Sequence, residues 1–196
     1  MKGQNSSADR KRLIHIYEGE GKGKTTAAVG LAVRFAGTGG SVLFAQFLKK
    51  NNSGELKILQ EIREVRLMLC ERSFGFTFQM SPEETQEAAA YYSGYLHDVL
   101  AAARSMADME TEGGNKEKTQ GILLILDEIL AAYRQNMVDR QELLHFLEEK
   151  PENLEIVLTG RYPAPELSAL ADYITVMEKK KHPYDKGISA RQGIEW

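Results

Sequence analysis

The sequence contains few of the features that mark secreted, membrane-spanning or polyanion-binding proteins. Cys70 is the only cysteine among 196 residues, so the chain cannot form an internal disulfide. No apolar run is long enough to cross a bilayer, and no apolar signal segment follows Met1. The 25 basic and 28 acidic side chains leave a net charge of −3, too balanced to favour a polyanion. These absences predict a soluble cytoplasmic protein with no membrane or nucleic-acid partner.

The length and the hydrophobic pattern predict a single α/β domain. We expect the polar residues 1–12 to form a flexible N-terminal segment and residues 13–196 to form the domain. The expected strands are 13–17, 41–45, 65–70, 122–126, 154–158 and 173–177, and the expected helices are 25–34, 55–61, 81–109, 140–149 and 165–171. A polar surface excursion is expected at 110–120. Alternating strands and helices predict a mostly parallel central sheet of about six strands with right-handed crossovers.

A glycine-rich loop lies between the first expected strand and the first expected helix. Its residues are Gly19, Glu20, Gly21, Lys22, Gly23, Lys24, Thr25 and Thr26. The glycines allow a tight turn that directs backbone N–H groups inward, and the helix that follows adds the positive end of its dipole. Lys24 would contact phosphates, and the hydroxyl of Thr25 would ligate a magnesium ion. The usual pattern has glycine at the position of Glu18, so the loop is a variant of the nucleotide-binding P-loop.

Further polar or aromatic clusters follow the other expected strands, at the edge where open α/β sheets bind ligands. These clusters are 46–49, 73–78, 127–128 and 159–161. Asp127 and Glu128 end the most apolar strand, where P-loop proteins keep the carboxylate that holds the metal ion. Because neighbouring residues on a strand face opposite ways, we expect one of the two to face the metal.

For other candidate residues, the sequence fits both a functional and a structural role. Phe74, Phe76 and Phe78 alternate around a glycine, and periodicity alone favours packing beneath a loop. Arg161 follows a Thr-Gly turn, from which it would either reach phosphates or lie at the surface. The histidines show no metal-ligand spacing, and no Cys-His or Ser-His-Asp arrangement is apparent.

These motifs, in this order, closely resemble the P-loop ATP:corrinoid adenosyltransferases over residues 13–196. The shared marks are the loop at 19–28, Gln46-Phe47-x-Lys49, Gly75-Phe76-Thr77-Phe78, Leu126-Asp127-Glu128, Thr159-Gly160-Arg161, and a tail with Lys181-His182, Gly187-Ile188 and Gly193-Ile194. The family loop also lacks the first glycine of the usual pattern. The resemblance implies a three-layer, RecA-like P-loop NTPase fold. It also implies a cytoplasmic homodimer that uses ATP, Mg²⁺ or Mn²⁺ and a corrinoid, with a flavoprotein reductase as electron source.

The resemblance further implies the reaction and the residues that carry it. Reduced Co(I) corrinoid would attack the 5′ carbon of ATP, giving adenosylcorrinoid and triphosphate. The implied catalytic residues are Lys24, Phe76 and Phe78; the nucleotide-binding residues are 19–26 and Arg161; the metal ligands are Thr25, Asp127 and Glu128; and the corrinoid-side residues are Gln46, Lys49, Phe76, Phe78 and His182. In the family, residues matching Phe76 and Phe78 displace the lower axial ligand of cobalt, which eases its reduction. Position 78 is often tryptophan in relatives, so Phe78 is a smaller wedge.

Two other functional classes share this loop. A P-loop ATPase or small-molecule kinase would transfer the γ-phosphate and release phosphate or ADP. A non-catalytic nucleotide-binding or corrinoid-binding relative would bind its ligand without turnover. The products formed from ATP distinguish the three classes.

Overall fold

The computed structural model describes residues 11–75, 80–112 and 120–195. Its middle layer is a six-stranded sheet in the order β3-β2-β4-β5-β1-β6, and every neighbouring pair is parallel. The strands are β1 (Ile14–Glu18), β2 (Ser41–Gln46), β3 (Val65–Leu69), β4 (Ile122–Asp127), β5 (Leu154–Thr159) and β6 (Tyr173–Val176). The predicted α/β class and parallel sheet are confirmed.

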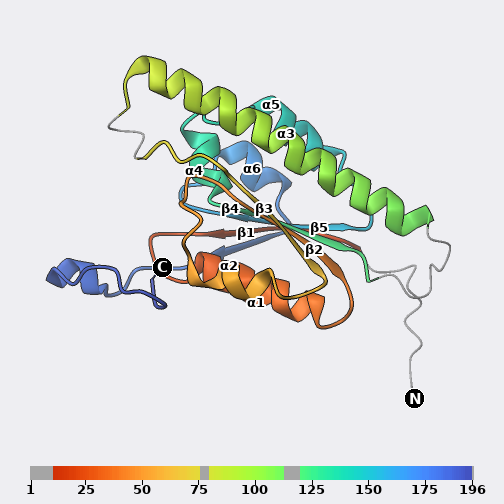
Figure 1. Ribbon diagram of the computed structural model, residues 1–196, viewed down its shortest axis with the longest axis horizontal. Helices are drawn as coiled ribbons and strands as arrows, with labels where there is room; N and C mark the ends of the chain where they lie inside the picture. The colour runs from red at the N-terminus through yellow and green to blue at the C-terminus, as the bar shows by residue number, and fades with distance from the viewer. Residues whose placement is uncertain (1–10, 76–79, 113–119, 196) are drawn as a thin grey trace.

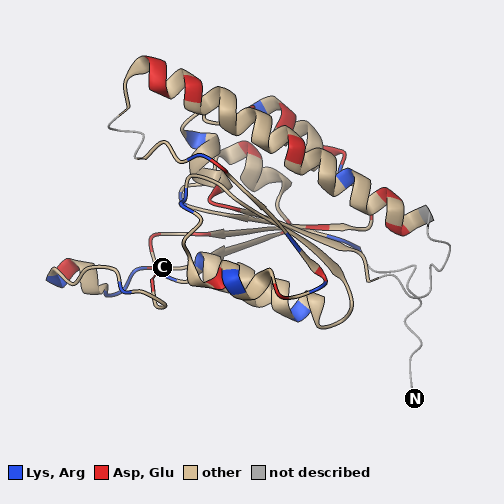
Figure 2. Cartoon of the chain, viewed as in Figure 1, with Lys and Arg blue, Asp and Glu red and all other residues tan. Residues whose placement is uncertain are grey.

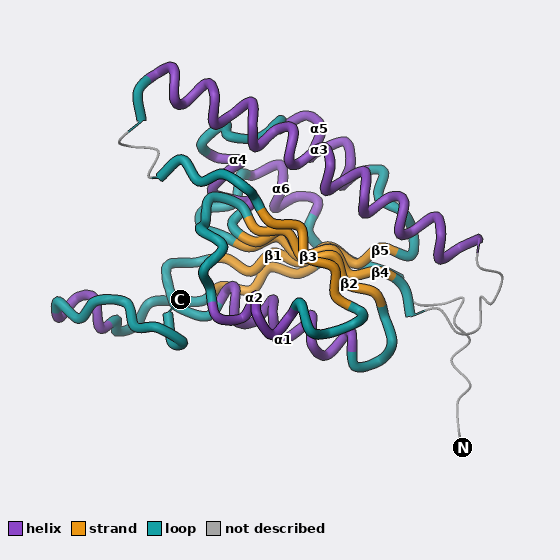
Figure 3. The backbone as a smooth tube through the Cα atoms, viewed as in Figure 1, coloured by secondary structure: helices purple, strands orange, loops and turns teal. Residues whose placement is uncertain are grey.

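Helices cover both faces of this sheet, giving three layers (Figures 1 and 3). One face carries α1 (Lys24–Ala36) and α2 (Gly54–Leu59), and the other carries α3 (Pro82–Glu112), α4 (Ile129–Arg134), α5 (Arg140–Glu148) and α6 (Pro165–Leu170). The buried apolar residues form two clusters, one beneath each helical layer. The short 3-10 helix η3 (Pro183–Lys186) lies in the C-terminal tail. Within the described ranges, no helix is both long enough and apolar enough to cross a membrane.

The centre of the sheet is fully buried, and α1 lies close against it. Every residue of β4 is buried, because helices cover both of its faces. Ala28, Ala32 and Ala36 of α1 are buried at intervals of four residues and join the apolar cluster on that face. Their small side chains let the start of α1 approach the ends of the strands.

The long helix α3 begins with a side-chain cap at Ser81. The Ser81 hydroxyl accepts a hydrogen bond from the Glu84 N–H (3.1 Å), and the Glu84 carboxylate accepts one from the Ser81 N–H (2.8 Å). The charged residues of α3 are mostly acidic (Figure 2). The helix continues to Glu112, so residues 110–112 of the expected polar excursion are helical; residues 113–119 lie outside the described part.

Arg12 lies within the segment expected to be flexible, and the last expected strand is present as β6. The flexible segment was expected to reach residue 12, but Lys150 donates a hydrogen bond to the Arg12 carbonyl (2.9 Å), and the Arg12 guanidinium lies 5.4 Å from the centre of the Phe35 ring. Residues 1–10 lie outside the described part. At the other end, β6 is an edge strand, and all four of its residues are exposed.

Candidate active site

The carboxyl ends of the central strands place three polar residues in one row. The sheet register aligns Gln46 with Asp127, and Leu126 with Leu158, so Thr159 follows beside Asp127. Gln46, Asp127 and Thr159 therefore point toward the same face of the sheet, which is the face that α1 covers. The row lies at the first turn of α1, directly after the glycine-rich loop.

The loop folds around the side chain of Lys24. The Lys24 ammonium donates hydrogen bonds to the carbonyls of Gly19 (2.8 Å) and Gly21 (2.9 Å), and the residue is 7% exposed. Burial, together with the neighbouring charge of Arg161, lowers the pKa of Lys24. A bound phosphate would offer this ammonium anionic acceptors in place of the two carbonyls.

Two glycines of the loop are required for different reasons. Gly23 precedes α1 with a φ of 121°, a conformation that only glycine adopts readily. Gly21 lies against the segment that follows β6: its N–H donates to the Met177 carbonyl (2.6 Å), and a Cβ there would lie 2.5 Å from the same oxygen. The glycine-rich pattern predicted a role at the phosphate site for both glycines. The structure shows that Gly21 also serves contact with the C-terminal segment.

Asp127 is fully buried and accepts hydrogen bonds on both carboxylate oxygens. Oδ1 accepts from the hydroxyls of Thr25 (2.9 Å) and Thr159 (2.7 Å). Oδ2 accepts from the Gln46 amide (2.9 Å) and the Lys49 ammonium (2.8 Å). Burial opposes ionisation, but the charge of Lys49 and these hydrogen bonds outweigh it and lower the pKa of Asp127. The carboxylate is therefore negatively charged at neutral pH.

Glu128 faces the site through an unusual backbone conformation. It follows the last residue of β4 in the left-handed region (φ 61°, ψ 18°), and its N–H donates to the Thr159 hydroxyl (3.0 Å). The alternation expected for neighbouring strand residues therefore does not apply to it. Glu128 lines a cavity beside the loop, and burial raises the pKa of its carboxyl. Both acids thus lie at the site, Asp127 beneath α1 and Glu128 in the cavity wall.

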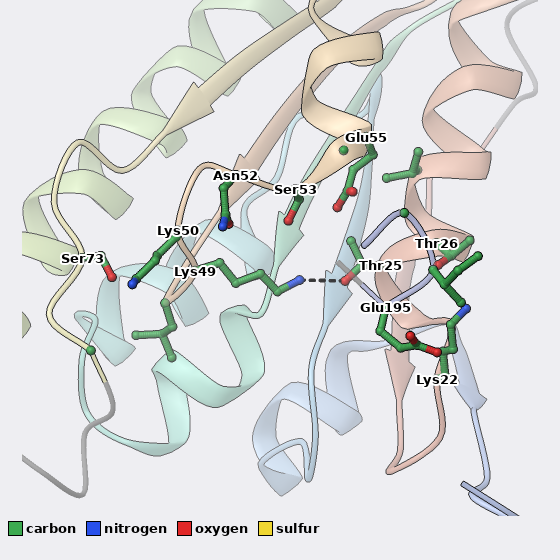
Figure 4. Close-up of a pocket in the computed structure, with 16 residues that line it drawn as sticks. Lys22, Thr25, Thr26, Lys49, Lys50, Asn52, Ser53, Glu55, Ser73 and Glu195 are labelled. Carbon is green, nitrogen blue, oxygen red and sulfur yellow. Dashed lines mark hydrogen bonds between the residues drawn. The ribbon is translucent and has the colours of Figure 1, made fainter. Parts of the chain in front are cut away.

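Two cavities meet at the start of α1. The smaller has a volume of about 300 Å³ and includes loop residues 20–26, Glu128 and Arg161 in its wall, with the tail residues His182, Tyr184, Ile188 and Ser189 opposite. The larger has a volume of about 890 Å³ and is lined on its far side by Lys50, Asn52, Ser53, Glu55 and Ser73 (Figure 4). Both cavities are lined by Lys22, Thr25, Thr26, Lys49, Ile194 and Glu195. Two ligands bound side by side would therefore meet at this shared wall.

Several predicted site residues lie elsewhere than expected or outside the described ranges. Gln46 is 1% exposed and lies beside Asp127 on the neighbouring strand, and it lines neither cavity. His182 lines the smaller cavity with Arg161, whereas we expected it on the corrinoid side. Phe76 and Phe78 lie outside the described residues.

Thr159 is a site residue whose role the sequence motifs did not predict. Its hydroxyl donates to Asp127 and accepts from the Glu128 N–H, so it connects the two acids. The signal that could have identified it is its position at the end of β5, next to the end of β4 in a parallel sheet.

The oxygens of Thr25 and Asp127 fit a divalent cation. In the described ranges, no group of three or more His, Cys, Asp or Glu side chains could hold a metal. An ion at Thr25 and Asp127 would therefore take its remaining ligands from phosphates and water, as Mg²⁺ usually does. The Lys49 ammonium donates hydrogen bonds to Thr25 Oγ1 (2.9 Å) and Asp127 Oδ2 (2.8 Å). These oxygens therefore already bind one positively charged group.

The parallel sheet, the glycine-rich loop that ends in Lys24 and Thr25, and the buried Asp127 define a P-loop nucleotide-binding protein. The model of the ATP:corrinoid adenosyltransferase BtuR/CobO/CobP family matches residues 10–196. The chain belongs to this family.

Individual relatives agree with this assignment. A corrinoid adenosyltransferase of Sinorhizobium sp is 34% identical over 193 residues, which cover 97% of this chain and 83% of the relative. The corrinoid adenosyltransferase of Escherichia coli (strain K12) is 29% identical over 188 residues, covering 96% and 87%. Among solved structures, EssC (ATPases 2 and 3) from Geobacillus thermodenitrificans aligns with a TM-score of 0.51 at 14% identity, over 94% of this chain and 36% of that chain. This last similarity shows the fold alone.

Proposed function

We propose that the chain transfers the 5′-deoxyadenosyl group of ATP to the cobalt of a reduced Co(I) corrinoid. The observation that carries the proposal is the pair of cavities that share a wall at Thr25, Thr26 and Lys49, one of them beside the phosphate loop. ATP would occupy the smaller cavity and the corrinoid the larger one. The reactive carbon of ATP and the cobalt would then meet at the shared wall.

The reaction needs stabilisation of a leaving group more than it needs a base. The electron pair of Co(I) forms the Co–C bond to C5′, the C5′–O bond breaks, and its electron pair leaves on triphosphate. Cobalt is thereby oxidised to Co(III), and no proton must be removed. The absence of a Cys-His or Ser-His-Asp arrangement in the sequence is compatible with such chemistry.

The residues around the loop would stabilise the triphosphate. Lys24 and the N–H groups at the start of α1 would bind its oxygens, and Arg161 would add a second positive charge from the wall of the same cavity. Thr25 and Asp127 would hold a magnesium or manganese ion, which when bound supplies positive charge beside the phosphates. Glu128 lines the same cavity as Thr25 and would add a second carboxylate beside the ion.

The corrinoid side of the proposal rests on the family resemblance. Phe76 and Phe78 would displace the lower axial ligand of Co(II), and their apolar rings suit this role because they cannot coordinate cobalt. Phe76→Ala should then slow turnover that starts from Co(II) with a reductase, while transfer from chemically prepared Co(I) is retained. Equal losses in both assays would contradict the wedge role.

The proposal also includes a homodimer, a flavoprotein reductase as electron donor and a cytoplasmic location. The family resemblance supports all three. The exposed edge strand β6, with Tyr173 52%, Ile174 48% and Val176 59% exposed, offers apolar surface for a second subunit. Sedimentation of the purified chain tests the dimer directly.

The experiment that tests the function is anaerobic. ATP, Mg²⁺ and chemically reduced Co(I) corrinoid are mixed with the protein, the corrinoid spectrum is followed, and the phosphate products are measured. A light-sensitive adenosylcorrinoid formed together with equal triphosphate supports the proposal, and Lys24→Ala should reduce the rate at least about 100-fold. ADP or orthophosphate as product would indicate a kinase or ATPase, and binding without product would indicate a non-catalytic relative.

A further inference from the structure

The Lys49 ammonium occupies the position where a divalent cation would be held. It contacts Thr25 Oγ1 at 2.9 Å and Asp127 Oδ2 at 2.8 Å, the same two residues that would ligate the ion. Figure 4 shows the Lys49 side chain extended toward Thr25, with the hydrogen bond between them drawn as a dashed line. A bound ion would need the negative charge of Asp127 and the Thr25 oxygen that the ammonium now contacts, so the two cations compete for this position.

Asp127 needs a positive partner whether or not a metal ion is bound. Its side chain is 0% exposed, and Lys49 is the cation in ion-pair contact with it among the described residues. An uncompensated buried carboxylate is strongly unfavourable, so the ammonium stabilises the protein when no ion is present. The same contact must break when an ion binds to Asp127.

Lys49 is placed so that it can move without disturbing the core. Its side chain is 29% exposed, and it lines both the smaller and the larger cavity. A displaced ammonium would therefore remain in solvent-accessible space between the two ligands. Gln46 and Thr159 would keep their hydrogen bonds to Asp127, because they approach the carboxylate from neighbouring strands.

We propose that Lys49 is a built-in counter-ion of Asp127 that competes with divalent cations for the metal position. This inference rests on the metal site of the proposed function. It assigns Lys49 a role at the nucleotide side of the shared wall in addition to the corrinoid side. As a consequence, the protein without nucleotide binds divalent ions weakly, and strong binding requires the additional ligands that a triphosphate brings.

Metal binding itself tests the proposal, with Mn²⁺ as the probe and no corrinoid present. The electron paramagnetic resonance signal of free Mn²⁺ is titrated with the wild type, Lys49→Met, Lys49→Arg and Lys50→Met. Lys50 is the matched control, because it is the next residue, carries the same charge and lines the larger cavity without contacting Asp127. Without nucleotide, Lys49→Met should bind Mn²⁺ at least tenfold more tightly than the wild type, whereas Lys49→Arg and Lys50→Met should resemble the wild type.

Two further measurements test whether the gained Mn²⁺ affinity arises at Asp127. Adding Asp127→Asn to Lys49→Met should abolish the gained affinity, and Mn²⁺ should raise the melting temperature of Lys49→Met more than that of the wild type. Equal Mn²⁺ affinity of Lys49→Met and the wild type overturns the proposal, as does an equal gain in Lys50→Met. If the wild type binds Mn²⁺ with ATP while Lys49→Met shows no gain, only this inference fails; absence of Mn²⁺ binding even with ATP removes the metal site of the proposed function as well.

Discussion

Replacing Thr159 with valine tests whether one hydroxyl holds the two acids of the site in place. Thr159 is 0% exposed, and valine has nearly the same shape without the hydroxyl. The substitution removes a hydrogen bond of 2.7 Å to the charged Asp127 and leaves the Glu128 N–H, bonded at 3.0 Å, without its acceptor. A hydrogen bond to a charged group contributes about 1.5–3 kcal/mol, and an orphaned buried donor costs about 1–3 kcal/mol.

Because Glu128 is partly exposed, water can accept part of the hydrogen bonding that its N–H loses. We therefore expect Thr159→Val to lower the free energy of unfolding by about 2–4 kcal/mol in total. Urea unfolding followed by far-UV circular dichroism measures this difference. Thr159→Ser is the matched control, since it keeps the hydroxyl and loses one methyl group, at a cost of about 1 kcal/mol. If Thr159→Val is no less stable than Thr159→Ser, the hydroxyl does not have the role described here.

Three further predictions follow from other contacts. Gly21→Ala should destabilise the protein by about 1–3 kcal/mol, because its Cβ would lie 2.5 Å from the Met177 carbonyl. Gly30→Ala is the control: it lies in open space on α1 and should stabilise the protein by about 0.5–1 kcal/mol. Urea unfolding compares the two variants, and equal effects would contradict the close approach of Gly21 to Met177. Burial raises the pKa of the Cys70 thiol to about 12, so a thiol reagent should modify Cys70 only after unfolding in guanidinium, and rapid reaction of the native protein would refute its burial. The pKa of Asp127 lies below its ordinary value of 3.8, so its ionised form stabilises the fold above that value and the contribution is lost as the pH falls through the lowered pKa. The stability gap between the wild type and Asp127→Asn should therefore shrink on acidification from about pH 7 to about pH 3, and a constant gap would contradict the assignment.

The sequence predicts the strands well because each is a short apolar run bounded by turn residues. All six expected strands are present, with ends that differ by at most a residue or two from β1 to β6. The helix α4 was not predicted, since it starts directly after Glu128 without a side-chain cap. Local patterns mark elements with a clear period, but they do not mark a helix that tertiary packing alone supports.

The site was predicted as far as its parts are local in sequence. The glycine-rich loop and Asp127 follow from motifs whose spacing is fixed by phosphate and metal chemistry. The roles of Thr159, Met177 and Lys49 depend on strand register and on approaches between distant segments, such as Gly21 N to Met177 O at 2.6 Å. The position of Glu128 depends on one left-handed residue, which a strand pattern does not reveal.

The strand order has a consequence for how the protein is made. β1, which leads into the phosphate loop, pairs with β5 and β6. Of the six strands it is synthesised first, but it has no neighbour in the sheet until β5 or β6 has been synthesised. The Met177 carbonyl that contacts Gly21 also belongs to this late part of the chain. During synthesis, β2, β3 and β4 can assemble first, while closing the long loop back to β1 is entropically slow. A nascent chain that ends before β5 therefore carries the complete nucleotide-binding motif in its sequence without a folded site to bind the nucleotide.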